Sequence, residues 1–372
     1  MQALIPPRFY FDAGLFEHER EMLFRRVWQM AGFVAELAAS DDFVTAEIGG
    51  RSVVVQNFGG ELRAFANVCS HRSARIHCEA RGNGPLRCPY HGWIYNREGV
   101  PYSIPARPRF DELRDRGYVQ NLALRPYDVE VCGGLVFVRE RVDGPSLAEY
   151  LGDAAATVEA MTAALGDRIS RDEWTVKANW KVLTENTLEA YHVGFVHEET
   201  FKKLSLGGMD FRFQGTHSGW ASGVDEATAK RMKKIVKLGR MPYPVDGYFH
   251  QFVFPNLTFS TLAGTTFGFQ VFRPVSATET RIESHLFLSR MDAGAEMAAV
   301  AAEMLSGVSG DFSREVIMED VAVCEAVQLG LPEAGGPGML SEEEERVGHF
   351  QDTYMRYMTG EVPAEHAALA EV

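Results

Sequence analysis

Two short segments decide the fold of this chain: Asn67-Val-Cys69-Ser-His71-Arg72 and Cys88-Pro-Tyr-His91-Gly-Trp93, with sixteen residues between His71 and Cys88. Each segment offers one thiolate and one imidazole, and we expect the two pairs on adjacent hairpin loops. A 2Fe–2S centre with two Cys on one iron and two His on the other needs this ligand set, and such a centre relays electrons. Tetrahedral zinc accepts the same residue types, so it stays open as the alternative.

The residues around these segments have the pattern of consecutive β-hairpins. Short apolar runs at residues 43–48 and 53–55 are followed by the pairs Gly49-Gly50 and Gly59-Gly60. Glycine pairs between apolar runs are typical of tight hairpin turns. We therefore expect a β-rich domain over residues 39–140, preceded by a helical leader over residues 1–38 that packs on the domain that follows.

The sequence beyond residue 140 alternates between helical and strand-like segments. Helical patterns cover residues 147–165, 296–330 and 341–358, the last opening with a Ser-x-x-Glu capping box, and strand patterns cover residues 248–289. The fold class is therefore expected to be α+β, with residues 141–372 forming one domain of helices on an antiparallel sheet.

Composition and charge narrow the possible partners. The net charge of −14 argues against nucleic acid, because phosphate binding needs a basic face. No apolar run approaches the ~20 residues of a membrane span, and the start lacks a signal peptide, so we expect a cytoplasmic protein without a membrane partner. The segment between Cys69 and Glu98 contains five arginines and two acids, so it carries a local excess of positive charge. This excess could bind an acidic redox partner, or it could serve only to keep the loops soluble.

A second group of metal-ligand residues follows in Glu189-Ala-Tyr-His192-Val-Gly-Phe-Val-His197. Glu189 and His192 are three apart and share a helix face, and a helix that ends after Gly194 would bring His197 round. Asn186 lies one turn before Glu189. Taken alone, such histidines are more often structural than metal-binding.

Together, the two groups resemble the α subunits of Rieske non-haem iron oxygenases. That family carries C-x-H, a gap of 15 to 17 residues and C-x2-H, followed by acid-x2-His-x4-His about a hundred residues later. Rieske proteins of respiratory complexes usually add a cysteine to each loop, where this chain has Ala74 and Tyr90. Ser73 departs from the glycine that is common after His-Arg, which puts a tight turn in question and leaves the ligands in place.

The resemblance implies a Rieske domain followed by a helix-grip, START-like catalytic domain that holds mononuclear Fe(II). Two His and one carboxylate form the usual ligand triad, here His192, His197 and, by position in a late helix, Asp320, with Glu319 as the fallback. It also implies that Glu189 is no ligand but bridges a histidine of the mononuclear site to His91 or His71 of the next subunit in a homotrimer.

The implied function is that of a terminal oxygenase, which uses O2 and electrons from a separate reductase or ferredoxin to oxidise a small organic substrate. The chain has no dinucleotide fingerprint, so NAD(P)H acts only through that partner. Glutamate at position 189 favours monooxygenation, by hydroxylation or N-demethylation of a quaternary ammonium compound. Aromatic cis-dihydroxylation is the alternative, and a Rieske electron-transfer protein with a ligand-binding module is the alternative of another class. Asn186, Phe254 and Phe269 are the expected pocket residues, although phenylalanines on strands also suit a plain core.

Overall fold

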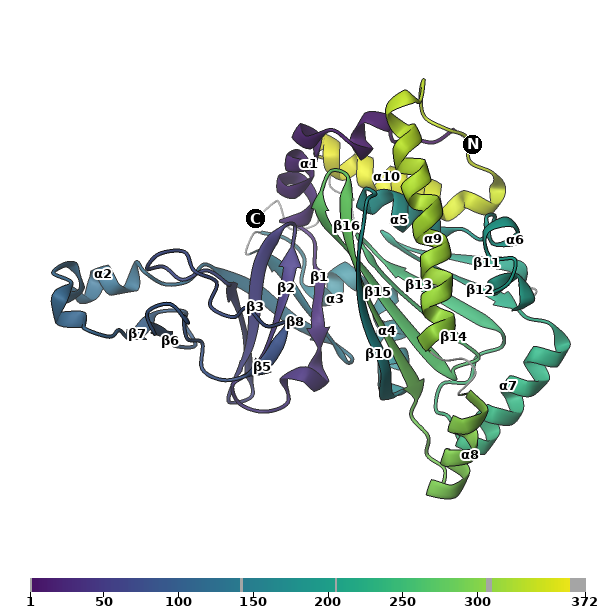
Figure 1. Ribbon diagram of the computed structural model, residues 1–372, viewed down its shortest axis with the longest axis horizontal. Coiled ribbons are helices and arrows are strands. Elements are labelled where there is room, and N and C mark those ends of the chain that lie inside the picture. The colour runs from purple at the N-terminus through teal and green to yellow at the C-terminus, as the bar shows by residue number, and fades with distance from the viewer. Residues whose placement is uncertain (1, 141–142, 205, 306–309, 362–372) are drawn as a thin grey trace. The chain divides into compact units, whose positions relative to one another are not determined.

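The computed structural model describes residues 2–140, 143–204, 206–305 and 310–361. Over these residues the chain forms two compact units, one of the residues up to Leu23 with those from Ala148 onward, the other of Phe24–Leu147. Each unit holds a seven-stranded antiparallel sheet, and helices accompany the sheet of the larger unit (Figure 1). The predicted α+β class is confirmed. Within the described residues, no helix is long and apolar enough to cross a membrane.

The unit of Phe24–Leu147 is built on a sheet of order β1-β9-β8-β4-β3-β2-β5, with a separate pair β6-β7. The predicted hairpins are present: both glycines of each pair have positive φ, between β2 and β3 and between β3 and β4. Its elements are β1 Gln29–Phe33, β2 Asp42–Ile48, β3 Arg51–Phe58, β4 Glu61–Ala66, β5 Arg81–Asn83, β6 Ile94–Tyr95, β7 Pro101–Ser103, α2 Arg116–Gln120, β8 Pro126–Cys132 and β9 Leu135–Glu140.

The leader is shorter than the sequence predicts. Helix α1 (Ala13–Glu19) and one π-helical turn (Arg20–Phe24) are followed by strand β1, which pairs antiparallel with β9. This long-range pairing takes residues 24–38 into the smaller unit, whereas the predicted leader extended to residue 38. The predicted boundary between the two domains is at residue 140, whereas the smaller unit of the structure ends at Leu147.

The larger unit carries a sheet of order β10-β16-β15-β14-β13-β12-β11, with α9 crossing its face and α5 packed beside α9 (Figure 1). The predicted helices and strands of this region are present among the described residues, and positions 306–309 of the predicted helical stretch 296–330 lie outside them. The elements are α3 Leu147–Leu151, α4 Ala154–Ala163, β10 Leu165–Val176, α5 Trp180–Leu188, α6 Val193–Val196, β11 Gly207–Gln214, β12 His217–Gly223, α7 Glu226–Gly239, β13 Tyr248–Val253, β14 Leu257–Leu262, β15 Thr266–Ser276, β16 Glu279–Ser289, α8 Ala295–Leu305, α9 Gly310–Gly330 and α10 Glu345–Thr359.

Candidate functional site

The two Cys-His segments of the smaller unit form loops with the same backbone pattern. In each loop the cysteine N–H donates to the carbonyl five residues further on, over 2.8 Å from Cys69 and 2.9 Å from Cys88. Each cysteine carbonyl accepts from the residue four positions on, Ser73 or Gly92, over 3.0 Å. Both of these residues are left-handed, with φ of +57° and +70°. Ser73 therefore keeps the turn that glycine would make, at a steric cost.

The four side chains predicted to bind a cluster lie together at the ends of these loops. The thiols of Cys69 and Cys88 are buried and within hydrogen-bonding reach of each other. The ring centroids of His71 and His91 are 4.6 Å apart, and His71 Nδ1 is buried with no hydrogen-bond partner. A buried ring nitrogen without a partner is expected of a ligand whose metal is absent. Tyr95 places its hydroxyl 3.0 Å from Cys69 Sγ, so the sulfur has a polar neighbour.

The spread of these four ligands distinguishes a two-iron cluster from a single zinc ion. Tetrahedral zinc would hold its ligand atoms roughly 3.3–3.8 Å apart, since each bond is about 2.0–2.3 Å long. Among the described residues, the one group of three or more potential ligands with all ligand atoms within 4.8 Å of one another lies elsewhere. The wider spacing of the two Cys-His pairs suits a binuclear centre.

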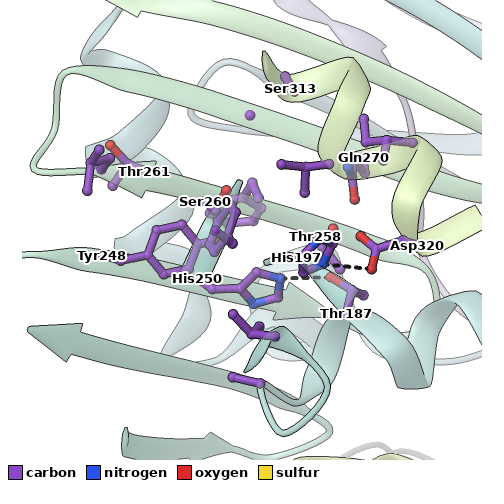
Figure 2. Close-up of a pocket in the computed structure, with 18 of the residues that line it drawn as sticks. Thr187, His197, Tyr248, His250, Thr258, Ser260, Thr261, Gln270, Ser313 and Asp320 are labelled. Atoms are coloured by element: carbon purple, nitrogen blue, oxygen red, sulfur yellow. Dashed lines mark hydrogen bonds and ion pairs between the residues drawn. The ribbon is translucent and has the colours of Figure 1, made fainter. Parts of the chain in front are cut away.

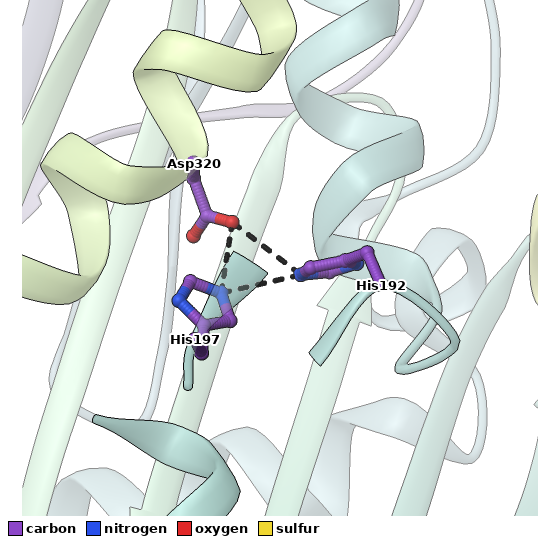
Figure 3. Close-up of side chains that lie close together, drawn as sticks. All are labelled: His192, His197 and Asp320. Atoms are coloured by element: carbon purple, nitrogen blue, oxygen red, sulfur yellow. Dashed lines mark hydrogen bonds and ion pairs between the residues drawn. The ribbon is translucent and has the colours of Figure 1, made fainter. Parts of the chain in front are cut away.

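That close group is His192, His197 and Asp320, which lie in the larger unit (Figure 3). His192 and His197 flank the short helix α6, and Asp320 projects from α9. The two Nε2 atoms are 3.3 Å apart, and Asp320 Oδ1 lies 3.4 Å from that of His192 and 3.1 Å from that of His197. Ligands at right angles on ~2.1 Å bonds would be about 3.0 Å apart, and tetrahedral ligands about 3.4 Å. The triangle thus fits one metal ion, with positions left open.

The charge around this triangle also suits a cation. Burial lowers the pKa of His192, but hydrogen bonds with Asp320 and Glu189 outweigh it and raise that pKa to about 9. Glu189 meets His192 twice, through its Nδ1 and through its backbone N–H, the latter over 3.1 Å. The site therefore stabilises positive charge between carboxylates, which a metal ion would supply.

The sequence did not reveal the role that the structure assigns to Glu319. Its Oε2 lies 2.6 Å from His197 Nδ1 and 2.6 Å from the hydroxyl of Thr200. Glu319 therefore orients the imidazole of His197. Asp320 is itself one corner of the triangle and also accepts a hydrogen bond from Asn186 Nδ2 over 2.7 Å. Carboxylates behind metal-binding histidines fix the ring and its tautomer. The two acids are adjacent in the sequence, so their separate roles could have been predicted only if it were known which side of the helix each one faces.

A cavity of about 180 Å³ opens beside the triangle and reaches across the sheet (Figure 2). Its wall on the sheet side is formed where neighbouring strands pair, with His250 opposite Ser260 and Thr258 opposite Gln270. Helices α5 and α9 close the other side. The sheet wall is unusually rich in hydroxyl and amide groups for an apolar substrate: Tyr248, His250, Thr258, Ser260, Thr261, Thr266, Gln270 and Ser284.

Of the three predicted pocket residues, the structure places Asn186 in the cavity wall and the two phenylalanines elsewhere. Asn186 lines the cavity, whereas Phe254 and Phe269 do not. Phe269 lies between Gly268 and Gln270 on β15, so strand alternation turns it to the opposite face of the sheet, where it packs on Phe259 and Phe287. Phe254 stacks on Tyr357 of α10, with ring centroids 5.5 Å apart.

Other aromatic side chains line the cavity instead. Phe201 and Trp220 each place a ring centroid 5.3 Å from that of Tyr248, and all three belong to the wall. Of these three, Tyr248 could have been found from the sequence, because it lies two residues from His250 on β13 and therefore on the same face of the sheet. Phe201 and Trp220 come from distant elements that only the fold brings together.

Comparison with known proteins gives two family matches and several full-length likenesses. The model for the ring hydroxylating alpha subunit (catalytic domain) matches residues 153–360, and that for the Rieske 2Fe-2S domain matches residues 27–123. The carnitine monooxygenase oxygenase subunit of Acinetobacter pittii is 27% identical over 92% of this chain and 90% of its own. The anthranilate 1,2-dioxygenase large subunit of Acinetobacter baylyi is 34% identical over 50% of this chain and 41% of its own.

A solved structure is similar over nearly the whole chain. It is that of a quaternary ammonium Rieske monooxygenase, described for carnitine oxidation by gut microbiota and inter-subunit electron transfer. It aligns with a TM-score of 0.75 at 21% identity and covers 96% of this chain and 95% of its own. At this identity the likeness establishes the fold.

Proposed function

The chain belongs to the family of ring-hydroxylating alpha subunits, and from that membership we propose that it oxidises a quaternary ammonium compound by monooxygenation. It is a Rieske-type oxygenase that uses a 2Fe–2S cluster, a mononuclear iron and O2, with electrons from a partner reductase. The proposal concerns its substrate, its ligand residues and its assembly. The observation that carries it is the triangle of two imidazoles and a carboxylate beside the cavity.

We assign the cluster to Cys69, His71, Cys88 and His91. The mononuclear iron is assigned to His192, His197 and Asp320, with Glu319 holding His197 in place. When bound, the cluster supplies single electrons and the iron activates O2 at its open positions. The chain's own residues orient the ligands and hold substrate in the cavity.

The cavity lining supports a quaternary ammonium substrate. Phe201, Trp220 and Tyr248 form an aromatic cluster in its wall, and aromatic faces attract cations that cannot donate hydrogen bonds. The likeness to the carnitine monooxygenase subunit supports the same class. Glu189, in place of the Asp of most ring-hydroxylating members, favours monooxygenation, by hydroxylation or N-demethylation.

We further propose a homotrimer in which Glu189 connects two subunits. Each of its oxygens binds His192 and keeps a second lone pair, which His91 or His71 of the next subunit would use. Tyr191 and Phe195, beside His192, are 55% and 77% exposed, as expected of apolar side chains that a neighbouring copy covers. The cytoplasmic location predicted from the sequence remains a prediction that cell fractionation would test.

Metal analysis tests the ligand assignment. We expect three irons per chain, with His192→Ala losing one while the visible absorbance of the cluster is unchanged. Two irons in the intact protein would contradict the oxygenase assignment and favour an electron-transfer protein with a ligand-binding module.

A substrate screen tests the reaction. Betaines and simple aromatic acids are incubated with the oxygenase, a reductase, NAD(P)H and O2, and the products are separated into aldehydes and diols. Formaldehyde or another aldehyde from a betaine is expected. A cis-diol from an aromatic acid would overturn the proposal in favour of dihydroxylation, the reaction class of the anthranilate dioxygenase relative.

A further inference from the structure

A buried arginine lies one layer behind the cavity wall. Arg346, in the first turn of α10, is fully buried. Its guanidinium donates to the side chain and carbonyl of Ser218 over 3.1 and 3.3 Å, to the carbonyl of Leu188 over 3.3 Å and to His250 Nδ1 over 3.2 Å. None of these partners is an anion, and the described residues provide no carboxylate within ion-pair distance. Such a buried charge is costly unless an anion approaches it.

The contact with Arg346 decides how His250 is protonated. Arginine only donates hydrogen bonds, so Nδ1 of His250 must accept and its hydrogen must be on Nε2. Burial and the neighbouring Arg346 charge hold the pKa of His250 well below its usual range, so the ring stays neutral. His250 therefore presents a fixed N–H donor on its cavity side.

That donor is aimed at Thr187, whose hydroxyl oxygen lies 3.2 Å from His250 Nε2 (Figure 2). Since Thr187 accepts this bond, its own hydroxyl hydrogen is left to donate, and the described residues offer it no other partner. Thr187 lines the cavity beside Asn186, which binds Asp320. The chain from Arg346 through His250 to Thr187 thus donates in one direction, toward the cavity and next to the metal triangle.

Apart from the metal site, the described residues of the cavity wall carry no competing cation. Among the described lining residues there is no lysine or arginine, and the carboxylates are Glu189 and Asp320, both held by histidines. Outside the metal site, a polarised donor chain backed by an unpaired charge is therefore the strongest attraction in the described wall for an anionic oxygen. A simple cation would find no matching group at this end.

We propose that Thr187 and His250, positioned by Arg346, bind a carboxylate of the substrate, so that the enzyme selects zwitterions over cationic alcohols. This inference rests on the proposed function and specifies its substrate class. The cationic end of such a substrate would lie toward Phe201 and Trp220, and its carboxylate at Thr187.

The test uses matched ligands that differ only in the carboxylate. Glycine betaine and choline share a trimethylammonium group, and benzoate and benzyl alcohol form the same pair in the aromatic series. Dissociation constants are measured by calorimetry on the oxidised holoprotein, and kcat/KM by O2 uptake with reductase. We expect the wild-type protein to bind glycine betaine more tightly than choline.

Thr187→Val removes the terminal donor at constant shape. Loss of one hydrogen bond to a charged group corresponds to about 10- to 100-fold weaker binding. We expect that loss for glycine betaine and less than about threefold change for choline, whereas Thr187→Ser should keep the wild-type ratio between the two. Arg346→Gln tests whether Arg346 positions His250 and Thr187. It should lower the preference for glycine betaine over choline by raising KM for glycine betaine, while the cluster absorbance is unchanged. If it fails to fold, the Thr187 pair decides alone.

The outcomes separate this inference from the proposed function. Equal loss for both ligands in Thr187→Val, or wild-type preference for choline, would overturn the carboxylate site and leave the quaternary ammonium class standing. Binding of benzoate in preference to both trimethylammonium compounds would overturn the substrate class. In that case, the carboxylate site stands only if Thr187→Val weakens the binding of benzoate and leaves the binding of benzyl alcohol unchanged.

Discussion

Replacing Glu319 with glutamine tests how the two adjacent acids of α9 divide their roles. Glu319 Oε2 accepts from His197 Nδ1 and from Thr200, both over 2.6 Å, whereas Asp320 meets the metal triangle. Glutamine keeps the size of the side chain and removes its charge. The imidazole of His197 would then be less basic and less firmly oriented.

The expected magnitude follows from this position behind the ligand. Loss of a carboxylate that orients a metal-binding histidine typically weakens metal binding 10- to 100-fold. This corresponds to about 1.4–2.8 kcal/mol. Asp320→Asn removes the ligand itself, so it should leave the mononuclear site empty at an iron concentration that still loads Glu319→Gln.

The assay is competition for Fe(II) with a chelator of known affinity, and the cluster absorbance serves as internal standard. Glu315→Gln is the matched control, because Glu315 is exposed on the same helix and loses the same charge. An iron affinity of Glu319→Gln within twofold of that control would refute the orienting role. Retention of iron by Asp320→Asn together with its loss from Glu319→Gln would reverse the assignment of the two acids.

Three further predictions concern the cluster loops and the buried interior. Ser73→Gly should raise the free energy of unfolding by about 1 kcal/mol, because φ of +57° is strained for serine, and Gly92→Ala should lower it similarly in urea titrations. Tyr95→Phe should lower the cluster potential by roughly 40 mV in a redox titration, because the hydrogen bond to Cys69 Sγ stabilises the reduced state; an unchanged potential would contradict this. Burial raises the pKa of Glu185 to about 7, so its contribution to stability is complete below about pH 4.5 and is lost as the pH rises through 7. The free energy of unfolding of Glu185→Gln should therefore exceed that of the wild type by about 3 kcal/mol at pH 8 and by about 1 kcal/mol at pH 5, measured in melting experiments.

Much of the smaller unit could be predicted because its information is local. Each Cys-His pair lies within one loop, and the glycine pairs mark turns whose φ angles other residues rarely adopt. Glu189 and His192 could also be predicted to lie close together, because only two residues separate them. The leader shows the limit of local information: residues 1–38 are predicted to be helical, but β1 is a strand because β9 provides a partner from far along the chain.

The sequence by itself predicted the Rieske domain and the α+β class, which the family match and the structure bear out, and it proposed the two Cys-His pairs and the histidine pair as metal ligands. Local spacing and local pattern carried these predictions. Only the tertiary structure decided that Asp320 completes the triangle with the two histidines while Glu319 contacts the far nitrogen of His197, because helix phase and packing set the direction of each side chain. It also decided that Phe254 packs on Tyr357 and that Arg346 backs His250, because these contacts join elements about a hundred residues apart. Ligand spacing is a local constraint, whereas the wall of a cavity is set by which elements pack together.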